Sequence, residues 1–239
     1  MGRGYKTLAL ALLAGVFFIG IHGVNLWYDA VQTAKLESEP VTVVVDAGHG
    51  GEDGGATGIA GTRESDVNLQ IALRARDLLA FAGVRTRMVR EQDTAVYTGE
   101  CRTISEKKSS DLKNRAKMVQ ETNHALLLSI HQNFFTQQKY SGAQVFYAGT
   151  DGSQALAQLA QDALREGVEP DNHRQIKRSQ SVYLMEHVDC PAILVECGFL
   201  SNAREEQLLC SDAHQIKLTA AICGAVIRYI SEEGSTNEV

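Results

Sequence analysis

The stretch "VVVDAGHGGEDGGA", residues 43–56, decides the fold of this chain. It begins within a short apolar run, residues 41–45 ("VTVVV"), which is typical of a strand buried on both faces. The run ends at Asp46 and His49 among five glycines. A turn needs glycine but has no need of a histidine. The stretch therefore predicts a strand that delivers side chains to a site at its carboxyl end.

Two further apolar runs end in the same manner. Residues 125–130 ("ALLLSI") lead directly into His131, and residues 191–195 ("PAILV") lead directly into Glu196. In an open α/β sheet, sites form beyond the carboxyl ends of the strands. If the three strands are parallel neighbours, their ends bring two imidazoles and a carboxylate together.

The rest of the chain alternates between strand and helix patterns. Further strands are predicted at 84–89 and, more weakly, at 143–148 and 181–185. Apolar stripes predict helices over 69–79, 112–119, 156–164 and 212–231, the first closed near Gly83 and the third near Gly167. This alternation predicts one α/β domain over residues 40–232, with a mostly parallel central sheet flanked by helices and a metal site at the carboxyl ends of its strands.

The N-terminal residues 1–35 have a different composition. Arg3 and Lys6 precede an uncharged stretch, residues 7–28, whose strictly apolar part covers residues 8–21. The apolar part suits a secretory signal peptide, while the whole uncharged stretch is just long enough to span a bilayer. We therefore expect an extracytoplasmic protein, secreted or anchored. Cleaved signal peptide and retained membrane anchor both stay open, and membrane contact is expected only through this segment.

Charge and cysteine content exclude two classes of protein. The net charge is −6, and the basic cluster is interleaved with acidic residues, so nucleic-acid binding is not expected. We expect this cluster to be a solvated loop and helix start; its basic members are Arg102, Lys107, Lys108, Lys113 and Arg115. The five cysteines are odd in number and contain no C-x-x-C pair, which argues against a disulfide framework. Three cysteines in apolar runs are predicted to be core residues: Cys190, Cys197 and Cys223.

The histidines and glutamates suit a catalytic zinc site. Two histidines and a glutamate form one of the standard three-ligand sets for catalytic zinc, and another carboxylate beside them can act as general base. Glu64 lies at the start of the helix that follows the glycine loop, where a carboxylate stays ionised. The separations are long and no H-E-x-x-H motif is present, so a metal site and hydrogen-bonded surface histidines both remain open. A phosphate cradle is excluded, because the Walker pattern is absent and G-x-G-x-x-G breaks at Asp53.

Three blocks of sequence resemble the signature blocks of the zinc-dependent N-acetylmuramoyl-L-alanine amidases of the amidase-3 type. These blocks are residues 43–72, 126–133 ("LLLSIHQN") and 192–202 ("AILVECGFLSN"). The resemblance implies that His49, Glu64 and His131 bind one zinc ion and that Glu196 is the catalytic carboxylate. Asp46 is a candidate for orienting a ligand imidazole as a hydrogen-bond acceptor, and a role in capping a helix or turn is an equal alternative.

Two other segments, residues 103–119 and 172–187, are similar to the sporulation- and germination-specific subgroup of that family. This resemblance implies hydrolysis of the amide between N-acetylmuramic acid and L-alanine of the stem peptide, forming the precursor of muramic-δ-lactam in spore cortex. It also implies a location near the forespore or cortex. One departure is the stretch "LMEHVDCP" before the last strand, where many family members carry a basic residue. No role is therefore carried over to Met185 or Glu186.

Two other functions remain as alternatives. One is a non-catalytic wall-binding module on the same fold, and the other is a zinc carboxypeptidase that acts on the stem peptide. An intact Glu196 argues against the first, because a pure binder has no need of a base. Peptidoglycan is the expected partner in each case, and the need for an accessory protein is left open.

Overall fold

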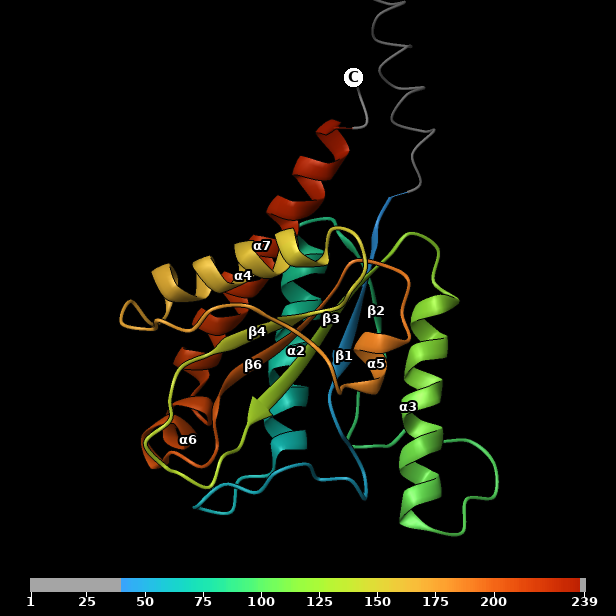
Figure 1. The fold of residues 1–239 in the computed structure, drawn as a ribbon, viewed down its shortest axis with the longest axis vertical. Helices are drawn as coiled ribbons and strands as arrows, with labels where there is room; N and C mark the ends of the chain where they lie inside the picture. Colours follow the sequence, from blue (N-terminus) through green and yellow to red (C-terminus); the bar gives the residue numbers. More distant parts are fainter. Residues whose placement is uncertain (1–39, 237–239) are drawn as a thin grey trace, which may run out of the picture. The chain divides into compact units, whose positions relative to one another are not determined.

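The computed structural model describes residues 40–236, which form a six-stranded sheet flanked by helices (Figure 1). The strand order is β2-β1-β3-β6-β4-β5. The strands are β1 (Thr42–Ala47), β2 (Arg85–Met88), β3 (Ala125–Asn133), β4 (Gln144–Tyr147), β5 (Lys177–Arg178) and β6 (Ala192–Phe199). The helices are α2 (Glu64–Phe81), α3 (Ile104–Gln120), α4 (Ser153–Gly167), α5 (Tyr183–Glu186), α6 (Ala203–Leu209) and α7 (Asp212–Thr236). All pairings are parallel except that of β4 with β6, which confirms the predicted fold class.

The three strands predicted to carry the site are adjacent and parallel. β3 lies between β1 and β6, with Val45 opposite Leu128 and Ile130 opposite Val195. Helices cover both faces of these strands, which explains why their sequences are continuously apolar rather than alternating. The three carboxyl ends therefore meet at one edge of the sheet, as the sequence predicts.

Two separate apolar layers cover the two faces of the sheet. One face packs against α2, α4 and α7, and its core includes Val43, Val45, Ile71 and Leu156. The other face packs against α3 and α5, with Val44 among its buried residues. In Figure 1 α3 and α5 lie to the right of the central strands, apart from α4 and α7. The alternation of Val43, Val44 and Val45 between the two layers follows from the period of two in a strand.

One predicted strand is wrong. Residues 181–185 were expected to extend, but residues 183–186 form the short helix α5. Leu184 and Met185 are buried in the second apolar layer, and the ring of Tyr183 stacks on His187 at a centroid distance of 3.8 Å. The helical turn buries Leu184 and Met185 in the core and stacks Tyr183 on His187, and these tertiary contacts override the strand preference of "SVYLM".

Other differences concern short elements and helix starts. β5 and α6 were not predicted, because two and seven residues are too few for a periodic pattern. α3 begins eight residues before the predicted start, since Thr103 and Glu106 form a capping box there.

The predicted signal peptide or anchor, residues 1–35, lies outside the described residues. Within the part of the chain that the structure describes, none of the helices combines the length and apolarity required to cross a bilayer. All five cysteines are free thiols; Cys197 and Cys223 are buried, and Cys190 is half-buried.

Candidate metal centre and active site

The sheet edge brings together four side chains that the sequence singled out. His49 follows β1, His131 lies in β3, and Glu64 is the first residue of α2. One ligand atom from each of these three lies within 4.8 Å of the others. Glu196 of β6 is the direct register partner of His131, so their side chains leave the same face of the sheet.

Glycines allow these side chains to approach the backbone. A Cβ atom added to Gly48 would lie 2.2 Å from Nε2 of His131, and one added to Gly55 would lie 2.5 Å from a carboxylate oxygen of Glu64. Neither contact is sterically allowed. His49 itself has a φ of 61°, in the left-handed region that non-glycine residues seldom adopt. The glycine-rich loop therefore bends tightly enough to return Glu64 to the end of β1.

The carboxylate of Glu64 is fully engaged. Its Oε1 lies 3.0 Å from Nδ1 of His131 and 3.3 Å from Nε2 of His49. Backbone N–H groups of Ala56 and Gln132 donate to its two oxygens over 2.8 and 3.2 Å. Burial alone would raise the pKa of this carboxyl, but the two imidazoles outweigh burial and hold the pKa far below its usual range.

His49 is oriented by Asp53, a residue that the sequence analysis assigned no role. Nδ1 of His49 lies 3.0 Å from Oδ2 of Asp53. A carboxylate can only accept, so Nδ1 donates and Nε2 is directed toward Glu64. Burial lowers the pKa of His49, but Asp53 and Glu64 together raise it to about 9. A metal ion bound at Nε2 of His49 would compete with the proton that Nε2 carries in the charged imidazole.

Glu196 contrasts with Glu64 because it has no hydrogen-bond partner at one oxygen. Its Oε2 is buried and unpartnered among the described residues. Burial raises the pKa of Glu196 to about 7, while the nearby histidines oppose that rise. A carboxyl group with such a pKa can exchange a proton near neutral pH.

Asp46 contacts an arginine and a serine. Its carboxylate accepts hydrogen bonds from Nη1 of Arg115 and from the hydroxyl of Ser129, the latter over 2.7 Å. These hydrogen bonds of Asp46 involve neither imidazole, and the carboxylate that contacts a histidine ring is that of Asp53. Burial raises the pKa of Asp46, but the charge of Arg115 outweighs it and the pKa is lowered.

Arg115 corrects one prediction from composition. The basic cluster was expected to be solvated, but Arg115 is only 2% exposed. Its guanidinium also donates to the backbone carbonyls of Ala47 and His49 and to the carboxylate of Asp111. The periodicity of α3 could have indicated that Arg115 is buried, because Arg115 adjoins Ala116 and lies four residues before Val119, and both of these lie on the apolar stripe.

Arg90 is a second buried arginine that the sequence analysis missed. It is 3% exposed and donates to the backbone carbonyls of Ala47, Gly48 and Ser65. These carbonyls belong to the end of β1 and the start of α2. Arg90 and Arg115 therefore hold the backbone that carries His49 and Glu64.

The residues present fit a zinc ion. Two imidazole nitrogens and one carboxylate oxygen face a common point, which is a standard donor set for a three-ligand zinc site with an open position. Glu64 is kept ionised, as a ligand must be. The unpartnered oxygen of Glu196 lies on the same edge but outside this group of three.

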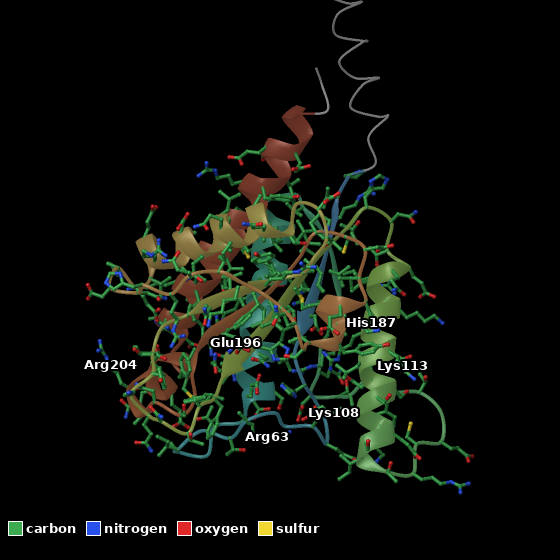
Figure 2. All side chains as sticks on the ribbon, in the orientation of Figure 1. Arg63, Lys108, Lys113, His187, Glu196 and Arg204 are labelled. Atoms are coloured by element: carbon green, nitrogen blue, oxygen red, sulfur yellow. The ribbon has the colours of Figure 1, made fainter. Side chains whose placement is uncertain are left out.

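A small cavity of about 70 Å³ adjoins the centre. Its lining combines His49 and His131 with Lys108 of α3 and with Val182 and Leu184 near α5. Glu196 lies over the central part of the sheet, and Lys108 and Lys113 project from α3 to one side of it (Figure 2). Met185 is buried in the core and Glu186 is exposed, whereas three charged residues of α3 line this cavity: Lys108, Asp111 and Arg115.

Comparison with known proteins identifies the family of this chain. The family model described as N-acetylmuramoyl-L-alanine amidase matches residues 43–228. The germination-specific N-acetylmuramoyl-L-alanine amidase of Bacillus subtilis is 39% identical over 197 residues, covering 82% of each chain. The CwlD amidase of Clostridioides difficile, solved in complex with the GerS lipoprotein, is 38% identical, with a TM-score of 0.77 over 80% of this chain and 99% of that one.

A second solved structure, an N-acetylmuramoyl-L-alanine amidase of Clostridium difficile 630, has a TM-score of 0.71 at 29% identity, covering 82% of this chain and all of that one. The similarity thus spans the whole sheet and every strand that carries a site residue. The chain belongs to the amidase-3 family and is an N-acetylmuramoyl-L-alanine amidase that acts on peptidoglycan.

Proposed function

We propose that this amidase holds one zinc ion with His49, Glu64 and His131 and uses Glu196 as its general base and acid. One observation carries the division of roles. Both carboxylate oxygens of Glu64 are engaged by imidazoles and backbone N–H groups, whereas Glu196, the register partner of His131, keeps one buried oxygen without a partner among residues 40–236. An unpartnered carboxylate beside a metal site is suited to receive a proton.

The chemistry divides between the ion and the side chains. Zinc, when bound, supplies a Lewis acid that polarises the scissile carbonyl and acidifies water. Glu196 accepts a proton from the attacking water and passes it to the departing amino group of L-alanine, so that the carboxylate is regenerated. Asp53 keeps the Nδ1–H of His49 engaged and its Nε2 directed at the ligand group.

Product analysis tests the reaction. Purified peptidoglycan treated with the zinc-loaded protein should yield intact stem peptides with free L-alanine amino termini and glycan strands with peptide-free muramic acid. Release of single amino acids from the peptide carboxyl terminus would instead indicate a carboxypeptidase. Binding without any product would indicate a wall-binding module.

We further propose a role in spore cortex maturation. The support is the similarity to the germination-specific relative at 39% identity and to CwlD at 38%. The peptide-free muramic acid left by the amidase is the precursor of muramic-δ-lactam. Deletion of the gene should remove muramic-δ-lactam from the cortex of spores of the source organism while vegetative wall composition stays unchanged.

The remaining proposals concern export and partners. We expect residues 1–35 to direct the chain out of the cytoplasm, as a cell-wall substrate requires, and mass spectrometry of the mature protein would tell a cleaved signal peptide from a retained anchor. Because the CwlD relative was solved with the GerS lipoprotein, we also propose a lipoprotein partner for this chain. Co-purification from sporulating cells with a tagged copy would identify it.

A further inference from the structure

The loop between β3 and β4, residues 134–143, carries a group of exposed aromatic side chains. Phe134 and Phe135 are each 47% exposed and Tyr140 is 36% exposed. Large apolar side chains seldom gather on a soluble surface without a binding role. We call these three residues the aromatic platform.

The platform is held in place rather than loose. The rings of Phe135 and Tyr140 meet edge to face at 5.0 Å, and Tyr140 stacks over Phe199 at 6.3 Å. The hydroxyl of Ser201 accepts from the backbone N–H of Phe135, and Asn202 donates to the carbonyl of Tyr140. These contacts tie the loop to the end of β6, the strand that carries Glu196.

The platform lies beside the candidate active site. Phe134 and Phe135 follow His131 by three and four residues, on the order of 10 Å along an extended chain. The loop and the glycine-rich loop lie at the same end of the sheet, whereas α3 flanks that end on the other side (Figure 1). A substrate bound at His131 therefore has the platform on one flank and α3 on the other.

The two flanks differ in charge. Lys139 is the one charged residue between positions 134 and 143, and the neighbouring polar residues are threonine, glutamine and serine. The α3 flank instead carries five basic residues against two acidic ones, Glu106 and Asp111. Lys108 lies beside the cavity, 3.5 Å from the carboxylate of Asp53, and Lys113 lies further along the helix. The substrate has a matching asymmetry: the stem peptide carries carboxylates, while the sugar backbone is mostly uncharged and offers apolar C–H faces that stack on aromatic rings.

We propose that the aromatic platform binds sugar rings of the glycan strand next to the muramic acid that carries the scissile amide, so that the peptide leaves toward α3. This inference rests on the proposed function, since it places the substrate across the same site. Ring stacking makes the platform a determinant of preference for polymeric glycan over short fragments.

The test compares two substrates. The double variant Phe134→Ala/Phe135→Ala is assayed on polymeric peptidoglycan and on a muramoyl-peptide that has a single sugar. We expect the ratio of kcat/KM for the polymer to kcat/KM for the fragment to fall about tenfold, mainly through KM, because ring stacking is lost. The aromatic variant Phe134→Tyr/Phe135→Tyr should keep the parent ratio.

Phe81→Ala provides the matched control. Phe81 is 90% exposed at the far end of α2, about 25 Å along the helix from Glu64. Its removal should leave the ratio unchanged. Co-sedimentation with glycan strands stripped of peptide gives a second measurement, in which the double alanine variant should bind less than the parent and Phe81→Ala should not.

Failure of this inference is distinct from failure of the proposed function. If the alanine pair keeps both the parent ratio and parent binding to stripped glycan, the platform does not bind sugar, and its aromatic rings are then available to a protein partner. If the zinc-loaded parent hydrolyses neither substrate, the proposed catalytic roles fail. If the alanine pair lowers hydrolysis of the fragment and of the polymer in equal proportion, the proposal that the platform binds sugar is also wrong.

Discussion

Two regions of the site, the start of α2 and the carboxyl half of β6, each present one glutamate, and their surroundings differ sharply. Glu64 receives two imidazoles and two backbone N–H groups, and its pKa is held far below the usual range. Glu196 is buried with one oxygen unpartnered in the part of the chain that the structure describes, and its pKa is raised to about 7. Burial therefore leaves a carboxyl with a raised pKa only where hydrogen-bonding and charged partners do not compensate for it. The environment thereby separates a permanent anion from a proton carrier.

The largest expected effect comes from removing a ligand. His49→Ala, His131→Ala and Glu64→Gln should each lose most of the bound zinc and nearly all activity, because two remaining protein ligands hold zinc poorly. Metal analysis after dialysis against a weak chelator gives the zinc content. Full activity in a metal-free ligand variant would end the zinc assignment.

Glu196→Gln should affect the rate alone. Glutamine keeps the shape of the side chain but cannot accept a proton at neutral pH, so the rate should fall at least about 10²-fold while zinc content stays near that of the parent. The same metal analysis and assay are used as for Glu64→Gln, which serves as its comparison. If Glu196→Gln loses zinc and Glu64→Gln keeps it, the two glutamates have the reverse roles.

Asp53→Asn should give a smaller change in zinc affinity. Loss of the charged acceptor at Nδ1 of His49 should weaken zinc binding about 10- to 100-fold without abolishing it. Competition with a chromogenic chelator measures the affinity. Asp66→Asn, on the first turn of α2 and half exposed, is a control that should leave the affinity unchanged. An Asp53→Asn protein with parental affinity would show that Asp53 does not orient the ligand.

Asp46→Asn should have the smallest effect on zinc affinity and should instead lower the free energy of unfolding. Breaking a buried ion pair leaves Arg115 with one charged partner fewer and should cost about 3 kcal/mol of unfolding free energy. Because the folded pKa of Asp46 is lowered, its stabilisation is present above the unfolded pKa of about 4 and is lost as the pH falls through the folded pKa. Urea unfolding at several pH values should therefore show a shallower acid loss in Asp46→Asn than in the parent. If the free energy of unfolding falls equally steeply with decreasing pH in both proteins, Asp46 does not contribute to the acid sensitivity.

Some residues of the candidate site could be predicted from the sequence and others could not. His49, His131 and Glu196 were predictable because each ends an apolar run, and a run of that kind indicates a buried parallel strand. Asp53 and Arg90 could not be assigned, since no pattern in a glycine-rich loop or after a short strand tells which polar side chain turns inward. Tyr183 was misassigned to a strand because local preference is weaker than the packing of Leu184 against the core.

The sequence by itself determined the three apolar strands, their polar ends and the glycines between them. These features depend on local preference and on solvent exclusion, which act on neighbouring residues in the chain. Only the tertiary structure decided that β3 lies between β1 and β6, that Arg115 is buried against Asp46, and that one glutamate is satisfied while the other is not. Those outcomes depend on contacts between residues far apart in the chain, such as Arg115 with Asp46, 69 positions apart, and His131 with Glu64, 67 positions apart. They also depend on the dielectric that such contacts create, which no local pattern in the chain encodes.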